Sequence, residues 1–136
     1  MTATRSLLMT TAFVEILVGV ALLVSPAVPA SLLLGASLAA PVALTVARVA
    51  GAATLSLGFA CWLARHDGLS RPGRAVVASM LVYNVAVVAV LAHASLGLGV
   101  TGVLLWPAVG LHTALAAWCV TCLRLGPSPR TVSTAR

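Results

Sequence analysis

The sequence predicts an all-α integral membrane protein, a four-helix bundle with both termini in the cytoplasm (N-in/C-in). Of its 136 residues 61% are hydrophobic and only 7% are charged, which is too apolar for an ordinary soluble domain. Seven of the eight arginines lie in three short stretches, namely Arg5; Arg65, Arg71 and Arg74; and Arg124, Arg130 and Arg136. Because cytoplasmic segments retain positive charge, a hydrophobic hairpin must lie between successive stretches, which gives four crossings.

The net charge of +6 is interpreted as a signal of topology. Such a charge also occurs in nucleic-acid-binding proteins, where basic side chains form a stripe with stacking aromatic residues between them. Here the arginines stand at the ends of hydrophobic runs and form no stripe, so no nucleic acid is expected as a partner. The expected partners are membrane lipids, including the anionic headgroups of the inner leaflet.

The first predicted span covers about residues 6–25, which is roughly 30 Å of helix and enough for the hydrocarbon core. The segment Ser25-Pro26-Ala27-Val28-Pro29 ends it. An alternative is a cleaved signal peptide, because Arg5, an apolar run and the small residues near Ala30 imitate one. The interruption of the run by Glu15 and its full spanning length argue against cleavage.

The next elements are an uncharged outer connection and the second span. Residues 30–41 form the connection, in which a short helix on the membrane surface is expected from four leucines, Leu32, Leu33, Leu34 and Leu38. The second span covers about residues 42–63. Residues 65–73 contain glycine, proline and charged side chains, which indicates a cytoplasmic loop.

The run from Ala75 to Leu123 is too long for a single crossing of about 20 residues. Its only turn signal is a group of three glycines, Gly97, Gly99 and Gly102. This predicts a third span over about 74–94 and a fourth over about 103–123. Residues 1–126 then form one transmembrane domain, and 127–136 form a disordered cytoplasmic tail because they are polar and short.

Small residues recur at the spacing of helix contacts. They are Ala47, Gly51, Thr54 and Gly58 in the second span, and Gly102, Gly110 and Ala114 in the fourth. Small residues allow helix backbones to approach closely in lipid, which predicts a compact bundle and a homo-oligomer or a subunit of a larger complex. The alternative is that small residues are simply abundant in an alanine-rich chain.

Polar residues from different spans fall at one depth. Counted at 1.5 Å per residue from the cytoplasmic arginine of each span, Glu15, Tyr83, Asn84 and Ser56 lie about 15 Å into the membrane and His112 about 18 Å. All are near the bilayer midplane, where polar side chains are costly and commonly functional.

Arg48 lies higher, about 25 Å from the inner charges. Two arrangements remain open for it. Its guanidinium either pairs with Glu15 across roughly 10 Å of depth, or extends to the outer headgroups.

We take Glu15, Arg48, Tyr83, Asn84 and His112 as the candidate ligand-binding or proton-binding residues. They would line a cavity at mid-depth for a proton, a cation or the polar head of a lipophilic molecule. The alternative is structural, because hydrogen bonds among such groups also hold helices together in lipid without any ligand.

No cofactor is identified, and no haem is expected, because His93 and His112 differ in height by about 10 Å and cannot face one iron. Cys61, Cys119 and Cys122 lie near the cytoplasmic boundary and should be free thiols. A soft-metal site at these cysteines is conceivable, but small buried hydrophobes are the preferred interpretation, so no metal is predicted. No catalytic residue or soluble-enzyme motif is found.

Two family resemblances can be stated. Residues 47–53 (ARVAGAA), 57–65 (LGFACWLAR), the Tyr83-Asn84 pair and residues 105–112 (LWPAVGLH) resemble small four-span bacterial membrane proteins of the DoxX-like group. That resemblance implies a bacterial cytoplasmic membrane and a link to quinone or redox membrane complexes. The position of Glu15 is similar to that in small multidrug resistance transporters, which implies exchange of a proton for cationic cargo. The long outer connection, Arg48 and the absence of an aromatic-rich third span depart from that pattern.

The sequence therefore predicts a small, non-enzymatic membrane protein. It would bind a lipophilic ligand of lipid or quinone type, or serve as an accessory subunit of a larger membrane complex. The second hypothesis is a proton-coupled small transporter that uses Glu15. The third is a membrane oxidoreductase or an enzyme acting on a hydrophobic substrate.

Overall fold

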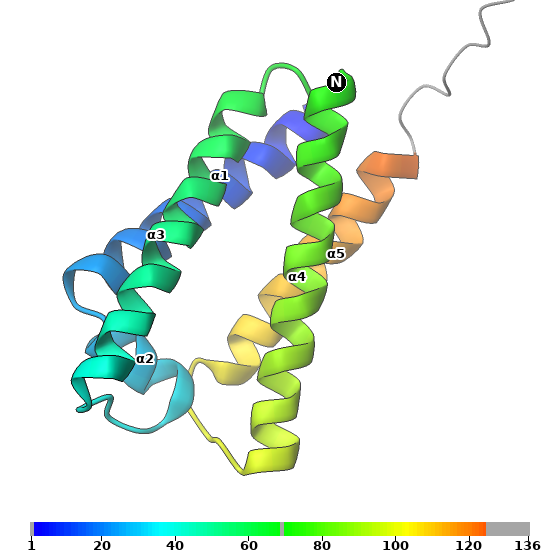
Figure 1. Ribbon diagram of the computed structural model, residues 1–136. Coiled ribbons are helices and arrows are strands. Elements are labelled where there is room, and N and C mark those ends of the chain that lie inside the picture. Colours follow the sequence, from blue (N-terminus) through cyan, green and yellow to red (C-terminus); the bar gives the residue numbers. More distant parts are fainter. Residues whose placement is uncertain (1, 69, 125–136) are drawn as a thin grey trace, which may run out of the picture.

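A computed structural model describes residues 2–68 and 70–124 as five helices, with no strand in those two ranges (Figure 1). The helices are α1 (Thr2–Val24), α2 (Ala27–Leu34), α3 (Pro41–Ala64), α4 (Arg71–Leu98) and α5 (Leu105–Arg124). In this part of the chain α1, α3, α4 and α5 are long and apolar enough to cross a membrane. The protein is thus an all-helical, multi-pass membrane protein, as predicted. The predicted disordered tail, 127–136, lies outside the described residues.

The span boundaries differ from the predicted ones mainly in α4, which covers 71–98 where 74–94 was expected. The hydroxyl of Ser70 accepts a hydrogen bond from the Gly73 amide at 3.1 Å, and this cap starts the helix earlier. The helix continues through Gly97 and ends where Gly99 adopts a left-handed conformation with φ 69°. The predicted hairpin is therefore confirmed, but its turn is restricted to residues 99–104.

Helices α1 and α3 pack closely because glycines face the partner backbone. A Cβ on Gly19 would lie 2.6 Å from the backbone nitrogen of Leu55, and one on Gly58 would lie 2.9 Å from the nitrogen of Ile16. Gly51 also faces α1. Of the predicted small-residue contacts, those of Gly51 and Gly58 are confirmed, whereas a Cβ on Gly110 would meet nothing within 4 Å.

Helices α4 and α5 form the second antiparallel pair. One contact joins their middles, where Asn84 meets His112 at 2.7 Å. Another joins their ends, where the Arg74 guanidinium donates to the Leu123 carbonyl at 3.0 Å, the usual position for a cation at a helix C-terminus.

The start of α1, residues 65–68, the start of α4 and the end of α5 lie at one end of the molecule, which we call the arginine end (Figure 1). It carries Arg5, Arg65, Arg71, Arg74 and Arg124. The core is concentrated in this half and joins α1, α3, α4 and α5 through Leu7, Leu8, Ala12, Cys61, Val77, Met80, Leu115, Cys119 and Cys122.

The opposite end, which we call the α2 end, is closed by α2 against the 99–104 turn (Figure 1). The Leu104 amide donates to the Leu32 carbonyl at 2.9 Å. Gly102 lies directly against the Leu33 carbonyl, and Gly35, with φ 70°, lies beside Thr101. The predicted short helix therefore exists, although it begins at Ala27 and excludes Leu38, and it connects the two helix pairs at this end of the molecule.

The outward faces of the long helices are suited to lipid. Large apolar side chains such as Phe13, Leu17 and Phe59 are exposed. Four exposed hydroxyls donate a hydrogen bond to a carbonyl of their own helix: Thr45 to Pro41, Ser56 to Ala52, Thr113 to Val109 and Thr121 to Trp118. These four hydroxyls thus need no water, as a surface in hydrocarbon requires.

Candidate functional site

Four of the five predicted site residues meet midway along the bundle. Glu15 on α1 is only 1% exposed, and Asn84 on α4 is fully buried. The Tyr83 hydroxyl donates to Glu15 Oε2 at 3.1 Å, which is a bond between α4 and α1. Tyr83 also packs edge-on against His112 on α5, with ring centroids 5.8 Å apart. We call Glu15, Tyr83, Asn84 and His112 the polar layer.

Asn84 holds His112 within the polar layer. Its Nδ2 donates to the Met80 carbonyl one turn earlier in α4, at 2.7 Å. Its Oδ1 lies 2.7 Å from Nδ1 of His112. Both ends of the amide are thus engaged, which is the arrangement expected for a polar group without access to water.

The carboxyl group of Glu15 is only half satisfied. Oε1 is buried and has no hydrogen-bond partner among the described residues, and the same holds for Oγ1 of Thr11, one turn away on the same face of α1. Thr11 differs in this from exposed threonines such as Thr45 and Thr113, whose hydroxyls donate to a carbonyl of their own helix. Unpaired buried polar atoms cost about 1 to 3 kcal/mol each, so this spot favours a proton, a water molecule or a ligand donor.

Of the two arrangements left open for Arg48, the pairing with Glu15 is not found. Arg48 is exposed in the second turn of α3, near the α2 end, and Glu15 Oε1 has no hydrogen-bond partner among the described residues. The face of α3 that packs on α1 follows Gly51 and Gly58, and Arg48 lies beside this stripe rather than on it. Ser56 is likewise outside the polar layer, because it is exposed and bonded to Ala52.

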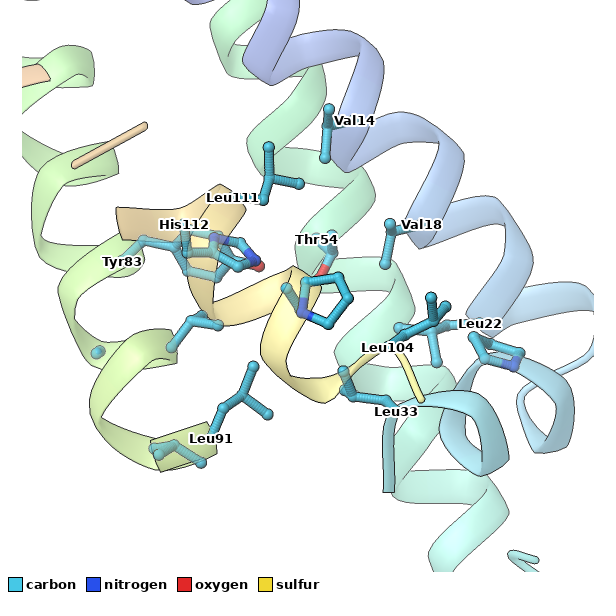
Figure 2. A pocket seen from close by; sticks show the side chains of 16 residues that line it. Val14, Val18, Leu22, Leu33, Thr54, Tyr83, Leu91, Leu104, Leu111 and His112 are labelled. Carbon is cyan, nitrogen blue, oxygen red and sulfur yellow. The ribbon is translucent and has the colours of Figure 1, made fainter. Parts of the chain in front are cut away.

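A pocket of about 700 Å³ lies between the α1/α3 and α4/α5 pairs, on the side of the polar layer away from the arginine end (Figure 2). Its floor contains Thr54, Tyr83 and His112, whose side chains lie together in the view. Its walls are apolar and consist of Val14, Val18, Leu22, Pro29, Leu33, Ala86, Val87, Val90, Leu91, Leu104, Pro107, Ala108 and Leu111.

The pocket opens on a flank of the bundle. Several wall residues are themselves exposed, among them Val18, Val90 and Leu111. These exposed side chains are apolar, so in a membrane this flank borders acyl chains. Pro29 and Leu33 close the pocket toward the α2 end. A molecule dissolved in the bilayer can therefore reach the polar floor without passing through water.

The other candidate groups lie elsewhere. Cys61, Cys119 and Cys122 are free, buried and part of the core at the arginine end. Within residues 2–68 and 70–124, no group of three or more His, Cys, Asp or Glu side chains is placed to hold a metal ion. His93 is exposed on α4 and does not line the pocket.

Sequence reasoning missed the two threonines of this region. Thr54 was assigned only to helix contact, yet it is 8% exposed and lines the pocket floor. Thr11 was not considered, although it lies four residues before Glu15 and hence on the same helical face. The spacing of four residues between Thr11 and Glu15 was the sequence signal that could have identified Thr11. No sequence signal marks the pocket, because its walls consist of apolar residues like those of any span.

Comparison with protein-family models, with curated proteins and with solved structures finds no match for this chain. What the protein does is therefore inferred from the pocket and the polar layer.

Proposed function

We propose that this protein binds a lipophilic molecule of lipid or quinone type in the pocket, with the polar head of the molecule on the floor formed by Thr54, Tyr83 and His112. The observation that carries the proposal is one apolar pocket of about 700 Å³ with polar groups only at its inner end. Its volume lies within the range of about 300 to 1,000 Å³ typical of small-molecule sites.

The lining also limits the kind of head group. Among the described residues that line the pocket no side chain is charged, and the floor lies near the middle of the spans. A phosphate or another charged head would be far from water there, at a cost of many kcal/mol without a counter-charge. The geometry favours a small uncharged polar head, with the apolar part of the molecule extending toward the α2 end.

Several further features belong to the same proposal. We place the arginine end in the cytoplasm of a bacterial cell, with both termini inside, because positive residues favour that side. Assembly as a homo-oligomer or as an accessory subunit, and kinship with DoxX-like proteins, stay predictions.

Filling the pocket tests the proposal. Ala108 lines the pocket wall on α5, so Ala108→Phe should displace a bound molecule, since a phenyl group occupies much of the space beside it. We expect native mass spectrometry in mild detergent to show a small lipophilic molecule on the wild type and at least a fivefold lower occupancy in the variant.

Ala114→Phe is the matched control, because Ala114 is exposed on the same helix and does not line the pocket. It should retain wild-type occupancy. Equal occupancy in Ala108→Phe and wild type, with both proteins folded, would contradict binding in this pocket.

A second candidate, a proton-coupled small transporter, is favoured by the unpaired Oε1 of Glu15. A carboxylate buried without a cation needs a counter-charge, and a proton or a cationic cargo would provide it. Glu15→Gln keeps the shape and the bond from Tyr83 but removes the exchangeable charge. We expect the variant to fold and to lose proton-linked flux of a lipophilic cation into liposomes. Flux equal to that of the wild type would contradict the transporter hypothesis.

A further inference from the structure

We infer that the pocket selects molecules whose head group carries a hydroxyl or another hydrogen-bond donor, and that Nε2 of His112 is the acceptor that recognises it, with Asn84 as the positioning residue. This inference rests on the proposed binding function and specifies its ligand class. It follows from the hydrogen bonds that fix the direction of each group in the polar layer.

The orientation of the Asn84 amide is fixed by its own helix. The Met80 carbonyl, 2.7 Å from the amide, can only accept a hydrogen bond, so the group facing it must be the NH₂ of Asn84. The amide oxygen then faces His112. The reversed amide would set two carbonyl oxygens against each other in a fully buried place.

The tautomer of His112 follows from this orientation. An amide oxygen only accepts, and it lies 2.7 Å from Nδ1, so Nδ1 must carry the hydrogen. In a neutral imidazole one nitrogen donates and the other accepts. With Nδ1 as the donor, Nε2 is left with a free lone pair.

Nε2 is available to a ligand. Within the described residues it makes no hydrogen bond, and it is not among the fully buried unpaired atoms. His112 lines the pocket floor beside Tyr83 (Figure 2). As long as the ring is neutral, the floor thus presents to the pocket an acceptor that cannot turn into a donor without breaking the Asn84 contact.

The remaining floor groups do not oppose a donor head. The Tyr83 proton is directed to Glu15, which leaves its oxygen as a further acceptor. The Thr54 hydroxyl rotates and can either donate or accept. A hydroxyl head would donate to Nε2 and still accept from Thr54, whereas a head without a donor would leave Nε2 unpaired. Sites built around such a bond reject analogues that lack it.

The test uses para-nonylphenol and its methyl ether, which share a skeleton and differ in the donor. Their Kd values are measured in lipid nanodiscs. Because the two probes partition differently into lipid, the decisive quantity is the ratio of the two Kd values compared between protein variants. We expect the wild type to favour the phenol by roughly tenfold beyond partitioning, the effect of one buried hydrogen bond.

His112→Phe removes the acceptor and keeps a flat ring. The ratio of the two Kd values should therefore fall to about the value expected from partitioning alone. His93→Phe is the matched control, since His93 is exposed on α4 away from the pocket, and it should keep the wild-type ratio. An unchanged ratio in His112→Phe would overturn the inference. Binding of both probes without preference by the wild type would overturn it too, but would leave the pocket proposal standing. Binding of neither probe would overturn both.

The role of Asn84 is tested by nitrogen-15 NMR of labelled histidine, which identifies the protonated ring nitrogen and requires no ligand. The wild type should show His112 protonated at Nδ1. In Asn84→Leu the population protonated at Nε2 should rise and the phenol preference should fall. A wild-type ring protonated at Nε2 would overturn the inference, even if Asn84→Leu does not fold.

Discussion

Gly19→Leu is expected to separate α1 from α3 and to lower the free energy of unfolding by about 3 kcal/mol, in the upper part of the range for overpacked sites. Any Cβ at this position would lie 2.6 Å from the backbone nitrogen of Leu55 and 2.8 Å from its Cα. These are backbone atoms, so no rotamer change relieves the contact. The measurement is unfolding by sodium dodecyl sulfate in bicelles, followed by circular dichroism.

Gly110→Leu is the control for this experiment. Gly110 is also inside a span, but it is exposed and has nothing within 4 Å of its virtual Cβ. We expect a change within about 0.5 kcal/mol, as for surface substitutions in general. Similar stability of the two variants would mean that α1 and α3 do not meet through their glycines.

Gly102→Val is expected to detach α2 without unfolding the two helix pairs. Gly102 lies against the Leu33 carbonyl, and a Cβ there has no space. The 99–104 turn must move away, which breaks the bond from the Leu104 amide to the Leu32 carbonyl. We expect amide hydrogen exchange in α2 to become roughly tenfold faster, while protection in α1, α3 and α4 stays as in the wild type.

The same variant should bind lipophilic probes more weakly, because Leu33 and Leu104 line the pocket and would move apart. Thr101→Val is the control, since its side chain is exposed and its change leaves the backbone approach intact. Unaltered exchange in α2 after the Gly102 substitution would show that α2 is not held by this turn.

Much of the fold could be predicted because hydrophobic length and charge act locally. A run of about 20 apolar residues is a span wherever it occurs, and the Ser25-Pro26 step marks the end of α1 by its own backbone preference. The two ends of α4, at Ser70 and Gly99, lie outside the predicted span 74–94 and were not predicted. The depth of the polar layer was predictable for the same reason. The rise per residue is constant, so Glu15, Tyr83 and His112 must lie at one level in spans that begin at one surface.

The depth of a residue in the membrane, however, does not determine the direction in which its side chain points around the helix axis. Ser56 shares the level of Glu15 and Tyr83, yet it is exposed on the lipid-facing side, while Thr54, two residues earlier, is buried at the pocket. Every face of these helices is apolar enough for lipid, so no hydrophobic stripe in the sequence distinguishes the inward face.

The sequence by itself determined that this chain is helical, crosses a membrane several times and carries polar groups at mid-depth, because length, charge and helical rise do not depend on neighbouring segments. Only the tertiary structure decided which of these groups meet. Close glycine packing brings α1 onto α3 and leaves Arg48 outside, while the looser contact between the two helix pairs leaves an apolar pocket above Tyr83 and His112. Such gaps depend on how whole surfaces fit together, and no single segment encodes them.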